Sequence, residues 1–184
     1  MRGILWHNND VGIALVTRSG SHSIFKHILK HYYPENNQEE MNQSCQDDTL
    51  WHPVKNLSNL YDLRYGGDIL KNNFAIMVRN PLERFVSACA RKNCTPIEGL
   101  TNMQEDVHFW SIYSMGIIVE SAKYFLFPNQ IEDCLSYLKL PTPLPKLNAE
   151  EVDKKPSLND SELEIFNTIY AQDIQLYNNL LKGK

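Results

Sequence analysis

The chain has 184 residues, of which 42% are hydrophobic and 22% are charged, and its formal net charge is −4. That length suits one domain with a sizeable core, so we expect a single globular domain over residues 1–184 and exclude a disordered chain. The negative net charge excludes a general affinity for nucleic acid or for anionic membranes, so any anionic ligand must be held by a local basic cluster.

The cysteines and the hydropathy exclude several further classes. The four cysteines form no CxxC pair and are too sparse for a secreted disulfide scaffold. Neither a secretory signal sequence nor a run of 18 apolar residues occurs. We therefore expect a cytoplasmic protein with free thiols, without a membrane span and without a metal centre.

The first informative stretch predicts a strand, a loop and a helix in direct succession. Residues 13–16 are apolar and partly β-branched, as in a buried parallel strand, and apolar residues recur at helical spacing from Ile24 until Pro34 ends the helix. A loop of this kind directs backbone N–H groups and a helix N-terminus toward one point, which suits a phosphate. The candidate phosphate ligands are Arg18, Ser19, Gly20, Ser21, His22 and Ser23. This stretch alone equally fits an ordinary strand–helix turn with a serine N-cap.

The following segment is polar and then weakly helical. Residues 35–48 contain almost no apolar side chain, which predicts an exposed loop. A short apolar piece ends in His52, and Pro53 follows it. Apolar residues at near-helical spacing predict a helix over residues 57–63, before a pair of glycines.

A second strand–helix unit carries the strongest signal. A buried strand is predicted over residues 74–78, and Arg-Asn-Pro-Leu-Glu-Arg-Phe-Val-Ser follows it at residues 79–87. Pro81 suits the first turn of a helix, which we expect to end near Lys92. Arg79 then lies at the carboxyl end of a strand, where open α/β sheets bind ligands.

The second half of the chain predicts alternating loops, helices and one strand. Residues 95–107 are polar and predict an irregular segment, whereas the apolar residues that follow predict a helix over 108–119. A strand over 124–127 and a short helix over 131–138 come next. An extended loop is expected over 140–156, and one long helix from residue 159 or 160 to 181, with an apolar stripe.

The two strand–loop–helix stretches together resemble the sulfotransferases that use 3′-phosphoadenosine-5′-phosphosulfate (PAPS). In that family the first loop holds the 5′-phosphosulfate, and an R-x-P-x-x-R-x-x-S motif holds the 3′-phosphate through its first Arg and its Ser. The motif is complete here, and the resemblance implies that Arg79 and Ser87 hold the 3′-phosphate. Residues 170–177 resemble the family's closing I-Y-x-x-D-x-x-L-Y helix. The implied fold is a three-layer α/β/α domain with a short parallel sheet, like a P-loop kinase.

The resemblance implies transfer of the sulfuryl group from PAPS to a hydroxyl acceptor, without a metal. The R-N-P-x-x-R form and the His-Phe-Trp stretch at 108–110 favour a carbohydrate acceptor. In the family a lysine of the first loop stabilises the bridging oxygen of the leaving nucleotide, and Arg18 stands at that place. Arginine keeps the charge but gives up its proton less readily than lysine, so the departure bears on rate more than on binding.

An acceptor hydroxyl needs a general base, and the resemblance offers two histidines. His52, before a proline, is the first candidate, and His108, in a D-x-H-F-W stretch, is the second. Each is equally consistent with a structural histidine.

Two other functions stay open. A nucleotide kinase would bind ATP with Mg²⁺, although the lysine of GxxxxGK[ST] is absent. A sulfotransferase-like binding protein would have lost turnover through Arg18.

Overall fold

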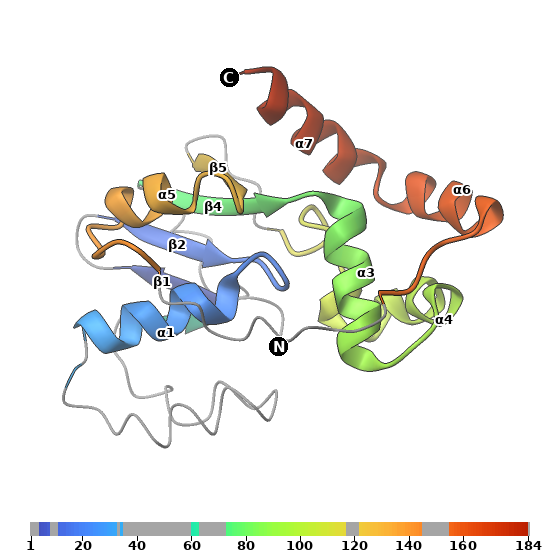
Figure 1. Ribbon diagram of the computed structural model, residues 1–184, viewed down its shortest axis with the longest axis horizontal. Coiled ribbons are helices and arrows are strands. Elements are labelled where there is room, and N and C mark those ends of the chain that lie inside the picture. Colours follow the sequence, from blue (N-terminus) through green and yellow to red (C-terminus); the bar gives the residue numbers. More distant parts are fainter. Residues whose placement is uncertain are drawn as a thin grey trace.

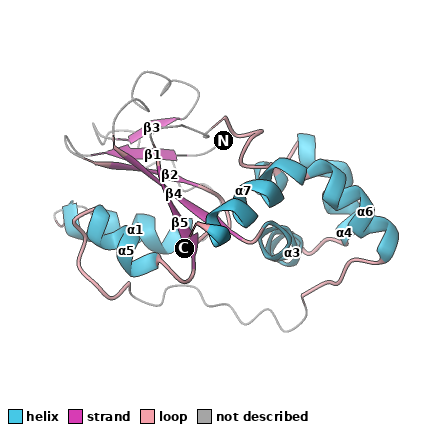
Figure 2. Ribbon diagram, turned by 90° about the horizontal axis from the view of Figure 1, so that it is seen from above, coloured by secondary structure: helices cyan, strands magenta, loops and turns pink. Residues whose placement is uncertain are grey.

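The computed structural model describes residues 4–7, 11–32, 34, 60–62, 73–116, 122–144 and 155–183. Within this part a five-stranded sheet has the order β3–β1–β2–β4–β5 (Figures 1 and 2). The strands are β1 (Ile4–His7), β2 (Gly12–Leu15), β3 (Leu60–Asp62), β4 (Phe74–Arg79) and β5 (Lys123–Phe127). β2, β4 and β5 are parallel, whereas β1 is antiparallel to both β2 and β3. The expected α/β class is therefore confirmed, but the sheet is mixed.

The three parallel strands bring their carboxyl ends to one edge of the sheet. β2 and the first five residues of β4 are fully buried, which explains their continuous apolar sequences. The register places Ala14 opposite Ile76 in one pair of strands and Arg79 opposite Phe127 in the other. The turn after β2, the end of β4 and the end of β5 are consequently neighbours.

Helices cover both faces of this sheet, as Figure 2 shows. The helices are α1 (Ser21–Tyr32), α3 (Pro81–Lys92), α4 (Pro96–Thr101), α5 (Ile131–Tyr137), α6 (Asp160–Ile169) and α7 (Ala171–Lys182). Ile13 and Leu15 of β2 pack with α1 and α5, whereas Ala14 and Val16 belong to the core that α7 covers. This alternation is the two-residue period of a strand buried on both faces, and it produces three layers.

A third core lies beyond the carboxyl edge of the sheet, among α3, α4 and α6 (Figure 1). Its centre is the Phe85 ring, whose centroid is 5.7 Å from that of Phe109 and 5.4 Å from that of Phe166. Such tilted aromatic contacts stabilise the folded state by more than the burial of their apolar area alone. They hold α3 in one orientation against the helices that follow it.

A buried ion pair joins α3 to α7. Arg84 Nη2 lies 3.0 Å from Asp173 Oδ2, and both side chains are almost wholly buried. Arg84 Nη1 also donates to the carbonyl oxygen of Trp110 at 2.8 Å, and the Asp173 carboxylate accepts the N–H of Ile112 at 2.9 Å. Burial raises the pKa of Asp173, against the opposing effect of Arg84 and of the backbone donors. The network fixes the helix that carries Ser87.

Several predicted elements are confirmed. The strands expected over 13–16, 74–78 and 124–127 correspond to β2, β4 and β5, with ends that differ by one residue. The helix expected from Pro81 to Lys92 is α3, and Asn80 caps it by accepting the N–H of Glu83. The short helix after β5 is also present.

Other predictions were wrong for physical reasons. Residues 60–62 form β3, paired with β1, rather than a helix. The segment 95–107 contains α4, whose capping box of Thr95 and Glu98 was a readable but overlooked signal. The helix expected over 108–119 is instead a 3₁₀ turn over Val107–Phe109 followed by turns up to residue 116, because Asp173 takes the N–H of Ile112.

The terminal helix is two helices rather than one. α6 begins after Asn159 as predicted, and α7 follows a break at Tyr170. The Tyr170 side chain enters the third core, where its hydroxyl donates to the carbonyl oxygen of Phe109. A bend at this position lets α6 cover α3 and α4 while α7 covers the sheet.

Three of the four cysteines lie in the described part and carry no disulfide. Burial raises the pKa of Cys89 to about 12 and that of Cys134 to about 12. Burial also raises the pKa of the Cys94 thiol, so the three thiols differ mainly in exposure, and the thiolate is the form that alkylates. We expect iodoacetamide to modify the half-buried Cys94 before Cys89 and Cys134 in the folded chain. Peptide mass spectrometry measures the three rates, and equal rates without denaturant would contradict this packing.

Candidate active site

The turn between β2 and α1 is tightly folded. Arg18 has a φ of 61° and Gly20 a φ of 75°, both in the left-handed region. The N–H of Ser19 bonds back to the carbonyl oxygen of Val16, and α1 begins where the N–H of Ile24 bonds to Gly20. A Cβ on Gly20 would lie 2.6 Å from Cε2 of Phe127, so this position requires glycine.

Arg18 connects this turn to α3. Its Nε and Nη2 both donate to the Ser87 hydroxyl, at 3.1 and 2.9 Å, across 69 residues of sequence. Because Ser87 is the acceptor in both bonds, its own O–H is able to donate to a third group. The two motifs that were identified separately in the sequence are therefore in direct contact.

Arg79 lies beside them at the end of β4. Its Nη1 donates to the carbonyl oxygen of Arg18 at 3.2 Å, and its Nε donates to Glu83 at 3.3 Å. The guanidinium carbon lies 5.6 Å from the centroid of the Phe127 ring. The Arg79 side chain is 16% exposed, so its charge is only partly screened by water. Two guanidinium groups thus stand at the same edge of the sheet.

The N-terminus of α1 completes the site. Its first turn contains Ser21 and Ser23, both partly exposed, and no acidic residue opposes an anion there. His22 lies in the same turn, although its side chain is outside the described part. The Ser19 hydroxyl is buried and has no hydrogen-bond partner among the described residues. Because a buried hydroxyl without a partner is costly, Ser19 is a natural donor to a bound oxygen atom.

Of the two candidate bases, the structure describes only His108. His52 lies outside the described residues. His108 Nδ1 is 2.6 Å from Oδ1 of Asp106, whose other oxygen pairs with Lys92 at the end of α3. The neighbouring Phe109 packs on Phe85, which lies about 200° around the helix from Ser87. The structure shows His108 paired with Asp106, and the base role of either histidine stays a prediction.

Phe127 is the site residue that the sequence did not single out. It belongs to the strand predicted over 124–127, and that prediction included no role for it in the site. Its contact with Gly20 and Arg79 follows from the register of β5 beside β4, and a register between strands is not visible in local sequence.

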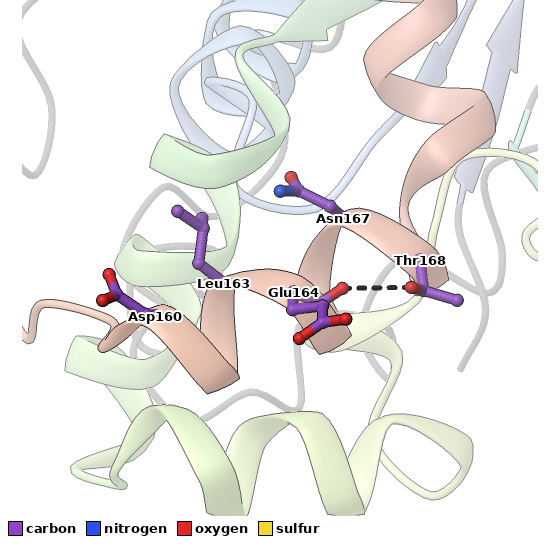
Figure 3. A pocket seen from close by; sticks show the side chains of 5 residues that line it. All are labelled: Asp160, Leu163, Glu164, Asn167 and Thr168. Carbon is purple, nitrogen blue, oxygen red and sulfur yellow. Dashed lines mark hydrogen bonds between the residues drawn. The ribbon is translucent and has the colours of Figure 1, made fainter.

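A surface hollow of about 420 Å³ lies elsewhere, on α6 (Figure 3). Its lining residues are Asp160, Leu163, Glu164, Asn167 and Thr168. In Figure 3 the Thr168 hydroxyl bonds to the backbone carbonyl of Glu164, at 3.0 Å. All five residues come from one helix, and none belongs to the motifs above, so the hollow is separate from the candidate active site.

Comparisons of the chain with protein-family models, with curated proteins and with solved structures found no match. Among the described residues, no group of three or more His, Cys, Asp or Glu side chains is placed to hold a metal ion. No helix in the same part of the chain has the length and hydropathy to cross a membrane. The motifs and their contacts are therefore the features of the chain that point to a function.

Proposed function

We propose that this protein is a sulfotransferase that moves the sulfuryl group of PAPS to a hydroxyl acceptor, with a carbohydrate as the acceptor class. The observation that carries the proposal is the contact of Arg18 with Ser87. It joins the loop and the R-x-P-x-x-R-x-x-S motif, which in the family that they resemble hold opposite ends of one nucleotide.

The donors of the site divide naturally between the two ends of PAPS. The N–H groups at the start of α1 and the Ser19 hydroxyl suit the 5′-phosphosulfate, because helix N-termini favour anions. Arg79 and the Ser87 hydroxyl suit the 3′-phosphate, since a guanidinium and a hydroxyl both donate to phosphate oxygens. Because the overall charge of the chain is −4, the attraction for an anionic nucleotide must come from this local cluster of donors and cations.

The reaction is an in-line displacement at sulfur. The acceptor oxygen forms a new S–O bond while the bond between sulfur and the bridging oxygen breaks, and the acceptor proton passes to a base. Negative charge grows on the bridging oxygen, which belongs to the departing 3′-phosphoadenosine-5′-phosphate (PAP). A fixed cation that meets this charge lowers the barrier, and Arg18 is the residue that we assign to it.

One observation also favours a second candidate, a protein that binds PAPS without turnover. Two of the donating nitrogens of Arg18 already bond to Ser87, so the arginine is committed to the 3′-phosphate motif. If that arrangement persists with PAPS bound, Arg18 contributes to binding and not to the departure of PAP.

Isothermal titration with PAP, AMP, and ATP with Mg²⁺ tests the proposal. PAP and AMP differ only in the 3′-phosphate, so their ratio of affinities isolates the Arg79 and Ser87 site. We expect PAP to bind at least about tenfold more tightly, as one charge-assisted contact provides. Equal affinities would overturn the proposal, and a preference for Mg-ATP would favour a kinase.

Transfer of radioactive sulfate from PAPS to a panel of carbohydrates then separates the two candidates. Labelled product identifies the enzyme. Selective PAP binding without labelled product across the panel supports the binding protein.

A further inference from the structure

We propose that Phe127 is a positioning residue that fixes Arg79 against the 17–20 turn and thereby sets the preference for a 3′-phosphate. This inference rests on the proposed function for its ligand, but the contacts that motivate it do not. Phe127 is the last residue of β5, directly opposite Arg79 in the register of the parallel pair.

One side of the Phe127 ring lies against the turn. An ideal Cβ on Gly20 would lie 2.6 Å from Cε2 and 3.1 Å from Cδ2 of the ring. These distances are too short for any side chain, so the ring occupies the place that the absent Cβ leaves. Any movement of the ring would therefore open space beside the turn.

The same ring supports the guanidinium of Arg79, 5.6 Å from its centroid, within the range of cation–π attraction. Two other groups hold Arg79. The carbonyl oxygen of Arg18 belongs to the turn, and Glu83 is 58% exposed, so its ion pair is a weak anchor. Phe127 and the turn are therefore the main constraints on where the charge of Arg79 stands.

The consequence is a mechanical link between the two ends of the nucleotide site. Because a single ring contacts both Gly20 and Arg79, it fixes the distance between the donors for the 5′-end and the cation for the 3′-end. A smaller side chain at position 127 would leave Arg79 free to adopt other rotamers. Binding of the 3′-phosphate would then carry the entropy cost of ordering it.

The experiment compares three single variants. Phe127→Leu removes the ring, and Phe127→Tyr keeps it. Phe125→Leu is the matched control, because Phe125 lies two residues earlier on the same strand and belongs to the core against which Phe127 also packs, but its ring contacts Tyr137 and not Arg79. For each variant we measure the affinity ratio of PAP to AMP and the thermal unfolding midpoint.

We expect Phe127→Leu to lower the PAP-to-AMP ratio by about two- to fivefold. Phe127→Tyr and Phe125→Leu should keep the wild-type ratio, even where the control unfolds at a lower temperature. An unchanged ratio in Phe127→Leu, with a loss of stability like that of the control, would assign Phe127 to packing alone.

A second measurement needs no nucleotide. The Nε–H resonance of Arg79, assigned through an Arg79→Lys variant, reports the order of the guanidinium by ¹⁵N relaxation. Phe127→Leu should make this group more mobile, whereas Phe125→Leu should not. If the wild type shows no preference for PAP, the proposed function fails, and this measurement alone decides the inference. An equally ordered Arg79 in Phe127→Leu would then overturn it.

Discussion

An Arg18→Ala variant is expected to transfer sulfate roughly 10²- to 10³-fold more slowly than the wild type. In the proposed reaction the charge that Arg18 meets grows only as PAP departs, so the rate should suffer far more than the affinity for PAP. Single-turnover rates with saturating PAPS measure the first quantity, and titration with PAP measures the second. Arg18→Lys should match or exceed the wild-type rate, because lysine is the residue of the family that the loop resembles and gives up its proton more readily than arginine.

Two control variants make this result specific. Lys30→Ala removes an exposed positive charge from the last turn of α1, at the opposite end of that helix from the 17–20 turn, and should change neither quantity. Ser87→Ala removes the hydroxyl that Arg18 contacts and should weaken PAP binding more than it slows transfer. Equal losses of rate and affinity in Arg18→Ala would make Arg18 a binding residue alone.

The second large effect concerns stability. Replacement of Asp173 by Asn should lower the free energy of unfolding by about 3–5 kcal/mol, because it leaves the buried Arg84 guanidinium without a counter-ion. Urea denaturation followed by circular dichroism measures the change. A matched control is Asp160→Asn, an exposed carboxylate in the first turn of α6, which should cost well under 1 kcal/mol.

A double variant, Arg84→Met with Asp173→Leu, tests the origin of that loss. Removing both charges together should recover part of the stability, since no uncompensated ion then remains in the core. A single Asp173→Asn variant as stable as the wild type would mean that the Arg84 charge finds another partner.

The sequence predicted those parts of the fold in which local signals agree. β2 and β4 have uninterrupted apolar sequences, and α3 has Pro81 at its start. Each of these elements was therefore predicted nearly to the residue. The same local reasoning placed Arg79 at the carboxyl end of a strand, and Arg79 is the last residue of β4. No prediction of a strand was made for residues 4–7, because β1 is defined by pairing with residues far along the chain.

The features that the sequence could not predict are contacts between distant segments. The partner of Arg84 is Asp173, 89 residues later, and no local pattern links these two residues. Phe127 was expected to be a strand residue. Only the arrangement of β5 beside β4 brings its ring to Arg79 and Gly20. Local periodicity carries no information about which strands become neighbours.

The ion pair between α3 and α7 also imposes an order on biosynthesis. Translation proceeds at about 5–20 residues per second, so Asp173 is added roughly 4–18 s after Arg84, from which it is separated by 89 residues. During that interval the Arg84 guanidinium lacks its native partner Asp173, and the helix that joins α3 to the sheet through this ion pair is absent. We therefore expect the contact of Arg18 with Ser87 to become fixed only after α7 has left the ribosome, although both residues emerged long before.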